Sequence, residues 1–97
     1  MAVYMIGYDL HPSEEEKYTD LYTALEELGS GGYWDCLDST WLVITEKTPA
    51  QIRDELRRHL KKDDRILVMR YGEGAAWYGF KDDCRTWLED NLKASNA

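Results

Sequence analysis

The sequence predicts an α+β domain in which strands alternate with amphipathic helices. Four apolar runs of five to seven residues have the length and the β-branched or aromatic content of strands. Two longer segments carry apolar residues at helical spacing, and each begins with a capping sequence. The 97 residues suffice for one domain, which we place at 1–92, with a frayed tail at 93–97.

The first apolar run, Val3–Asp9, is the predicted central strand. Alternate residues of a strand point to opposite faces of a sheet, and here both sets are apolar as far as Asp9. A strand that is covered on both faces belongs in the interior of a sheet. Asp9 then lies at the C-terminal end of that strand, where open α/β sheets tend to hold ligands.

Two helices are predicted from capping signals and periodicity. The first has Ser13 as its N-cap, with Glu16 closing a capping box, and it ends at Gly29. Its apolar stripe comprises Tyr18, Leu21, Tyr22, Leu25 and Leu28. The second helix begins with the capping sequence Thr48–Gln51, and Asp63-Asp64 ends it.

The other runs complete the predicted order of elements. Tyr33–Leu37 and Thr40–Glu46 should form a hairpin, and Arg65–Tyr71 should form a further strand. Ala75–Tyr78 is a candidate for a short fifth strand. A last helix follows, with one aligned side that consists of Phe80, Cys84, Trp87, Leu88 and Asn91.

This βαββαβ order, followed by a short C-terminal strand and helix, predicts a ferredoxin-like antiparallel sheet. Two right-handed crossovers place both main helices on one face of the sheet. The strands are apolar on both faces, so the second face also needs a cover. The C-terminal helix and a second copy of the chain are the two candidates. We expect a homodimer, because two-fold self-contacts are the commonest way to form oligomers.

The net charge of −7 is unevenly distributed along the chain. Residues 1–46 contain ten acidic residues and one basic residue, which gives a net charge of −9. Residues 47–71 contain four acidic and eight basic residues (+4), and residues 72–97 contain five acidic and three basic residues (−2). An acidic chain repels phosphate backbones, so nucleic-acid binding is disfavoured outside the middle segment. No apolar run reaches the ~20 residues of a membrane span and no signal peptide is visible, so we expect a cytoplasmic protein without a membrane partner.

The chain has two cysteines, Cys36 and Cys84, which are far apart in sequence. Neither has a second Cys or a His at metal-ligand spacing, so a zinc site is not expected. We interpret both as reduced core residues, with a disulfide as the alternative.

Five short stretches span nearly the whole chain and resemble a known family: Tyr8-Asp9-Leu10, Ser39–Val43, Gln51–Arg53, Ala75–Gly79 and Trp87-Leu88. The family is the SinR-like group of small bacterial and phage proteins. It is similar to the ferredoxin-fold small subunit of the CRISPR spacer-acquisition complex and to VapD-type ribonucleases. The resemblance implies a homodimer. It also implies that the strand-ending acid used by metal-dependent nucleases of the CRISPR family corresponds to Asp9.

Asp9 is the candidate catalytic residue and metal ligand. A hard cation such as Mg²⁺ takes carboxylate oxygens and waters, and a two-fold axis would bring Asp9 close to its copy. His11 is two residues further on and is a candidate general base. The alternative is structural: Asp9 fixes the turn before Pro12 by accepting backbone N–H groups, and His11 is solvated.

Candidate ligand-binding residues lie in two kinds of segment. Arg53 and Arg57 belong to the basic middle segment and could contact phosphates. The alternative is that these bases interact with the dipole of the second helix. Trp41, Trp77 and Tyr78 could stack on bases, and their alternative role is packing in the core or at an interface.

We therefore expect a homodimeric ferredoxin-like protein that resembles the CRISPR-associated small subunit. It would be a divalent-metal-dependent nuclease or phosphodiesterase, with Mg²⁺ as its cofactor, or an inactive relative. The alternative is a non-catalytic binding module, related to phage or to antiviral defence, that holds a small nucleotide signal or a partner protein. A purely structural or antitoxin-like role is a third hypothesis.

Overall fold

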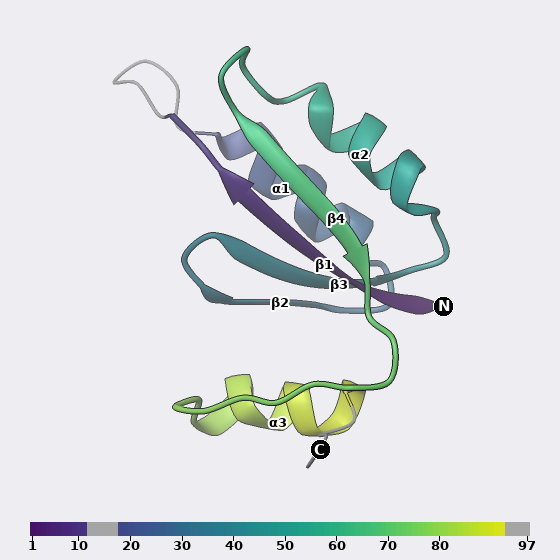
Figure 1. Ribbon diagram of the computed structural model, residues 1–97, viewed down its shortest axis with the longest axis vertical. Coiled ribbons are helices and arrows are strands. Elements are labelled where there is room, and N and C mark those ends of the chain that lie inside the picture. Colours follow the sequence, from purple (N-terminus) through teal and green to yellow (C-terminus); the bar gives the residue numbers. More distant parts are fainter. Residues whose placement is uncertain (12–17, 93–97) are drawn as a thin grey trace.

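The computed structural model describes residues 1–11 and 18–92, in which strands and helices alternate (Figure 1). The elements are β1 Ala2–Asp9, α1 Thr19–Leu28, β2 Tyr33–Leu37, β3 Thr40–Thr45, α2 Pro49–Arg57, β4 Arg65–Arg70 and α3 Asp82–Asn91. The strands form one antiparallel sheet in the order β2-β3-β1-β4. The α+β class is confirmed. β1 is a central strand as predicted, because it pairs with β3 on one side and with β4 on the other.

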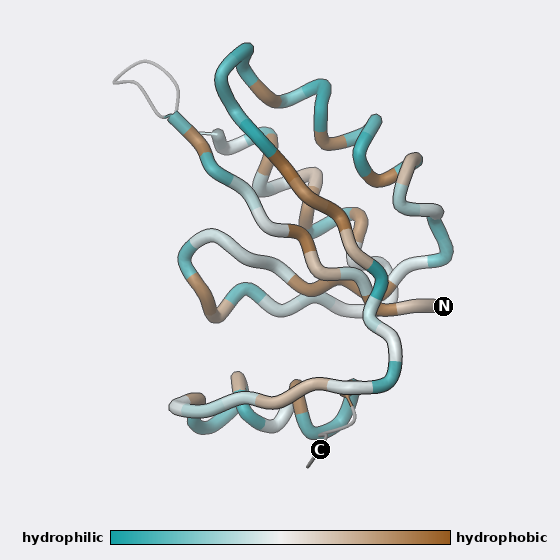
Figure 2. The backbone as a smooth tube through the Cα atoms, in the orientation of Figure 1, coloured by the Kyte–Doolittle hydropathy of each residue, from teal (hydrophilic) through white to brown (hydrophobic). Residues whose placement is uncertain are grey.

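Helices α1 and α2 cover one face of the sheet. Tyr4 and Ile6 of β1 share that face with Trp41 and Val43 of β3, and α1 packs against β3 while α2 packs against β4. The longest apolar stretch in Figure 2 follows β4, whose inner face closes the same core. The helical core residues are Leu21, Ala24, Leu25, Leu28, Ile52 and Leu56.

The start of α2 agrees with the prediction, and its end does not. The Gln51 backbone N–H donates to Thr48 Oγ1 at 3.1 Å, and the Thr48 N–H donates to Gln51 Oε1 at 2.9 Å, which completes the capping box. The helix ends at Arg57 instead of continuing to Asp63-Asp64. The N–H groups of His59 and Leu60 bond three residues back, so the chain tightens into turns after Arg57.

The start of α1 depends on a residue that the capping argument did not use. The helix begins at Thr19, after Tyr18 in the left-handed conformation with φ 55°, and Tyr18 is buried. The predicted capping box of Ser13 and Glu16 lies outside the described residues. Tyr22 was assigned to the apolar stripe, but it lies at the surface with 37% exposure.

Gly29 ends α1 as predicted, although for a different reason. Its φ of −77° lies outside the left-handed region, so conformational freedom does not explain the glycine. A Cβ at Gly29 would lie 2.7 Å from the carbonyl oxygen of Gly32, which is too close for any side chain. The connection to β2 therefore selects glycine at this position by close backbone approach.

Helix α3 covers part of the second sheet face. Trp34 lies opposite Leu42 in the register and so faces away from Val43 and the main core. Its indole N–H donates to the Cys84 carbonyl oxygen at 3.0 Å, and its ring meets Phe80 edge-on with centroids 5.1 Å apart.

The cysteines correct the prediction of two reduced core residues. Cys36 and Cys84 form a disulfide, with Cα atoms 6.2 Å apart, that joins β2 to α3. Cys36 and Asp35 are successive residues of β2 and point to opposite faces of the sheet, so Cys36 lies on the face where α3 docks. Because 48 residues separate Cys36 from Cys84, the sequence does not show that the two cysteines are close in the fold.

The open half of the second face lies over β1 and β4. Leu67 and Met69 of β4 are 55% and 51% exposed there, so α3 alone does not cover the apolar face. The predicted fifth strand is absent from the described residues: Ala75 is an isolated bridge residue in an otherwise irregular segment. No helix in residues 18–92 is both long and apolar enough to cross a membrane.

Candidate functional site

The predicted catalytic residues, Asp9 and His11, lie at the end of β1 and in the segment that follows it. Asp9 is exposed at the end of β1, where it lies opposite Arg65 of β4 in the strand register. The backbone of His11 is engaged, because its N–H donates to Asp64 Oδ1 at 2.9 Å and its carbonyl oxygen accepts from Lys61 Nζ. Across residues 1–11 and 18–92, no three His, Cys, Asp or Glu side chains are grouped so as to hold a metal. Mg²⁺ at Asp9 stays a prediction.

Asp64 connects the loop after β1 to the turn before β4. Its carboxylate accepts the backbone N–H groups of His11 and Lys61, at 2.9 and 2.7 Å, and the Tyr18 hydroxyl at 2.8 Å. Burial by itself would raise the pKa of Asp64. The two backbone N–H groups, the Tyr18 hydroxyl and the nearby charge of Lys61 outweigh burial and hold that pKa below its usual value. As a carboxylate, Asp64 therefore joins His11 and Tyr18 to the turn before β4.

The predicted ligand-binding residues are dispersed over three places. Arg53 and Arg57 line an open cleft of about 430 Å³ between α2 and β4, and Arg53 pairs with the exposed Asp54 at 3.0 Å. Trp77 and Tyr78 lie in the segment before α3, where Tyr78 is 96% exposed. Trp41 lines a different cleft, so these residues do not converge on one ligand.

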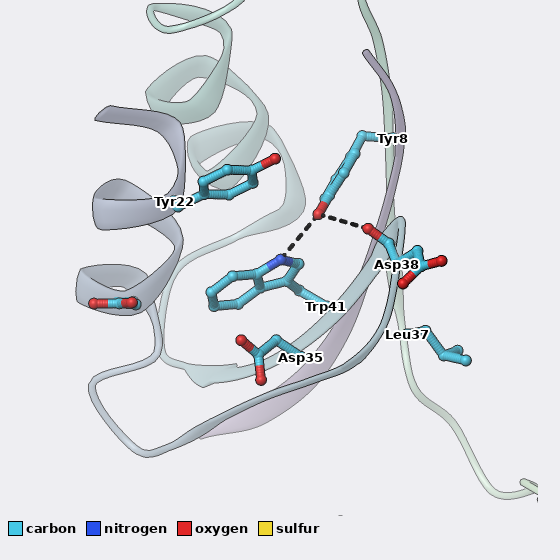
Figure 3. A pocket seen from close by; sticks show the side chains of 7 residues that line it. Tyr8, Tyr22, Asp35, Leu37, Asp38 and Trp41 are labelled. Carbon is cyan, nitrogen blue, oxygen red and sulfur yellow. Dashed lines mark hydrogen bonds between the residues drawn. The ribbon is translucent and has the colours of Figure 1, made fainter. Parts of the chain in front are cut away.

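That second cleft combines aromatic rings with carboxylates and has a volume of about 410 Å³ (Figure 3). It lies between α1, the β2–β3 hairpin and the end of β1. Its described aromatic and acidic lining residues are Tyr8, Tyr22, Trp41, Glu26, Asp35 and Asp38. We call it the acidic aromatic cleft.

Local geometry explains why these side chains meet. Tyr22 and Glu26 are four residues apart on α1 and so occupy the same side of the helix. Asp35 follows Tyr33 by two residues on β2 and points to the same sheet face as Tyr33 and Val43. Since β2 is an edge strand, that end of the helical face stays accessible.

The rings of Tyr22 and Trp41 face one another. Their planes are within 10° of parallel and their centroids are 6.5 Å apart, with the Tyr22 ring lying above the indole in Figure 3. Trp41 is held in place: its indole N–H donates to the Tyr8 hydroxyl at 3.1 Å, and Tyr8 donates to the Asp38 carbonyl oxygen at 3.3 Å. Trp41 is 5% exposed, so it forms the rigid side of the pair.

The electrostatic character of the cleft is negative. None of the carboxylates of Glu26, Asp35 and Asp38 forms an ion pair with a described residue. Burial raises the pKa of Tyr8; the hydrogen bond from Trp41 opposes this, and Tyr22, Asp35 and Asp38 raise it further. Tyr8 is therefore a neutral phenol at physiological pH. The described lining residues are aromatic or acidic apart from Leu37, so the cleft attracts positively charged groups.

Of the residues that line this cleft, the sequence analysis names only Trp41 as a candidate ligand-binding residue. Two signals were present: the charge of −9 over residues 1–46 and the one-turn spacing of Tyr22 and Glu26. Neither shows that α1 and the β2–β3 hairpin enclose a common space, because that depends on tertiary packing.

Comparisons with known proteins do not assign the chain. No protein-family model matches it, and no solved structure matches it. The structure defines a small α+β protein with a four-stranded antiparallel sheet and an acidic aromatic cleft. The resemblances to the SinR-like family, to the CRISPR small subunit and to VapD-type ribonucleases stay predictions.

Proposed function

We propose that this chain is a non-catalytic binding module that holds a positively charged group of a partner molecule in the acidic aromatic cleft. The observation that carries the proposal is the parallel ring pair of Tyr22 and Trp41 beside three carboxylates without ion-pair partners among the described residues. Aromatic faces attract cations through their quadrupole, and the attraction grows when water is excluded. The carboxylates add charge complementarity, which steers a cationic partner to the cleft.

This proposal uses residues that lie together, whereas the nuclease hypothesis rests on Asp9 and His11. Asp9 faces a basic residue, Arg65, in the register, and the described residues hold no group of three or more His, Cys, Asp or Glu side chains placed to bind a metal ion. The negative potential of the cleft also opposes phosphate groups. A positively charged partner protein therefore fits better than a nucleotide signal.

Two further proposals concern fold and assembly. The order β2-β3-β1-β4, with both crossover helices on one face, supports a ferredoxin-like domain. The exposed Leu67 and Met69 support a homodimer that covers the open half of the second face.

The disulfide gives information on the cellular compartment in which the protein acts. Disulfides persist in oxidising compartments and are rare in the cytosol, so the Cys36–Cys84 bond supports a non-cytosolic site of action and argues against the cytoplasmic prediction.

The binding proposal is tested by titrating ¹⁵N-labelled protein with short cationic and acidic peptides while following the indole N–H resonances. Cationic peptides should shift the Trp41 resonance, and added salt should weaken their binding. Glu26→Gln should weaken binding, while Glu27→Gln serves as the matched control on α1, because it removes the same charge outside the cleft lining. Absence of any Trp41 shift with cationic peptides, or an equal response to acidic ones, would refute the proposal.

A further inference from the structure

Gly7 lies in the central strand β1, although the fold of a single chain does not require a glycine there. Its φ is outside the left-handed region, and a Cβ built on it would meet no heavy atom within 4 Å. Glycine also weakens a strand, because it has no side chain to pack and loses the most backbone entropy on folding. In the interior of a strand it often marks a site where another group approaches the sheet closely. The space above Gly7 therefore suits a group from outside the chain.

A projecting apolar side chain lies directly beside this space. Ile6 points into the helical core, so its neighbour Gly7 points to the second face of the sheet. Leu67 of β4 is the register partner of Gly7, and it is 55% exposed on the same face. A gap and a projecting side chain thus lie at the same level of two adjacent strands. A two-fold axis that runs between β1 and β4, parallel to them, would place Leu67 of each copy over Gly7 of the other.

The same axis matches the next register pairs along these strands. Met5 pairs with Met69, which is 51% exposed, so the two methionines would pack against each other across the axis. Asp9 pairs with Arg65 in the register. Both are exposed, and neither forms an ion pair within residues 1–11 and 18–92. Across the axis each Asp9 would meet the Arg65 of the other copy, so the contact is matched in charge although each chain carries −7.

Helix α3 leaves room for this arrangement. It docks on β2, at the edge of the sheet remote from β4, so the uncovered width is that of β1 and β4. Stacked sheets lie about 10 Å apart, which is close to the diameter of a helix. The sheet of a second copy and α3 therefore fit side by side in one layer, with α3 next to the β4 edge of that copy.

We infer that the open half of the second face binds a second copy of this chain, with Leu67 of each copy seated over Gly7 of the other. A two-fold contact requires one surface to complement itself, and the three register pairs meet this requirement. The inference rests on the homodimer proposed above and specifies its interface. It does not involve the acidic aromatic cleft, because Trp41 lies on the helical face of the sheet.

Sedimentation velocity of the intact, oxidised protein over the micromolar range tests the gap. Gly7→Val should raise the dissociation constant of the dimer at least roughly 30-fold, because every dimer contains two filled gaps. The same variant should not lower the free energy of unfolding of the monomer, since the new side chain meets nothing within the chain and valine favours strands. Gly72→Val is the matched control: its Cβ position is equally open, but Gly72 lies outside both strands, so the dissociation constant should not change.

Cross-linking tests the position of the axis. Both native cysteines are in the disulfide, so a cysteine introduced at Met5 or at Met69 is the sole free thiol of its chain. A short bismaleimide should link Met5→Cys to Met69→Cys when the two variants are mixed, and should link neither variant to itself. A self-linked Met5→Cys dimer, or a Gly7→Val protein that dimerises as tightly as the wild type, would overturn the inference and leave a homodimer through another contact. A wild type that stays monomeric refutes the interface and the homodimer together, whereas the Trp41 titration tests the binding proposal separately.

Discussion

Removing the disulfide between Cys36 and Cys84 should destabilise the protein strongly. The bond joins positions 48 residues apart, and closing a loop of that length reduces the entropy of the unfolded chain. The loop-entropy relation gives about 4 kcal/mol at 25 °C, so the Cys36→Ala/Cys84→Ala variant should lose about that much free energy of unfolding. For a domain of this size, the Tm should fall by roughly 15–30 °C.

Guanidinium unfolding of the wild type and the double variant, each with and without reductant, measures this loss. Reductant should lower the unfolding free energy of the wild type and leave that of the double variant unchanged. The double variant therefore controls for effects of the reductant that do not involve this disulfide. Trp34 lies against Cys84 and Phe80, so its indole N–H resonance reports whether α3 remains docked. A loss below about 1 kcal/mol, or free thiols in the denatured, unreduced wild type, would refute the reasoning.

Other predictions follow from particular contacts. Thr48→Ala removes the α2 cap and should cost about 1 kcal/mol in chemical unfolding, and no measurable loss would contradict the capping argument. Leu56→Ala empties a fully buried site and should cost about 2–5 kcal/mol by the same measurement. Folding lowers the pKa of Asp64, so the stability that this carboxylate contributes is present at neutral pH and is lost as the pH falls through the folded-state pKa. In Asp64→Asn, the free energy of unfolding should therefore fall less steeply as the solution is acidified. An unchanged slope of unfolding free energy against pH would refute this. Leu67→Glu/Met69→Glu should convert the proposed homodimer to a monomer in sedimentation velocity, and a monomeric wild type across the micromolar range would exclude the dimer.

Local patterns predicted most of the sheet and the start of α2. The run from Val3 to Asp9 is apolar on both faces and proved to be a central strand, although only the face with Tyr4 and Ile6 is buried in the core. Thr48 and Gln51 are close in sequence, so their capping box needs no knowledge of the fold. The predicted end of α2 was wrong because the chain forms turns after Arg57 through local backbone hydrogen bonds, which the spacing of apolar side chains does not indicate.

Features that depend on long-range packing were missed. The disulfide required knowing that α3 docks on β2, and Cys36 and Cys84 carry no local sign of that contact. The acidic aromatic cleft forms only because α1 and the β2–β3 hairpin approach each other, so the sequence did not predict that its lining residues lie together. Tyr22 belongs to the predicted apolar stripe but lies at the surface, because helical spacing alone cannot distinguish the edge of an apolar stripe from its centre.

The contacts of Asp64 have a consequence for protein engineering. One carboxylate binds the His11 backbone and the Tyr18 hydroxyl, so the two ends of the stretch between them are fastened at a common point. An engineered variant that must keep the register of β1 should therefore keep Asp64, because this one side chain holds both His11 and Tyr18.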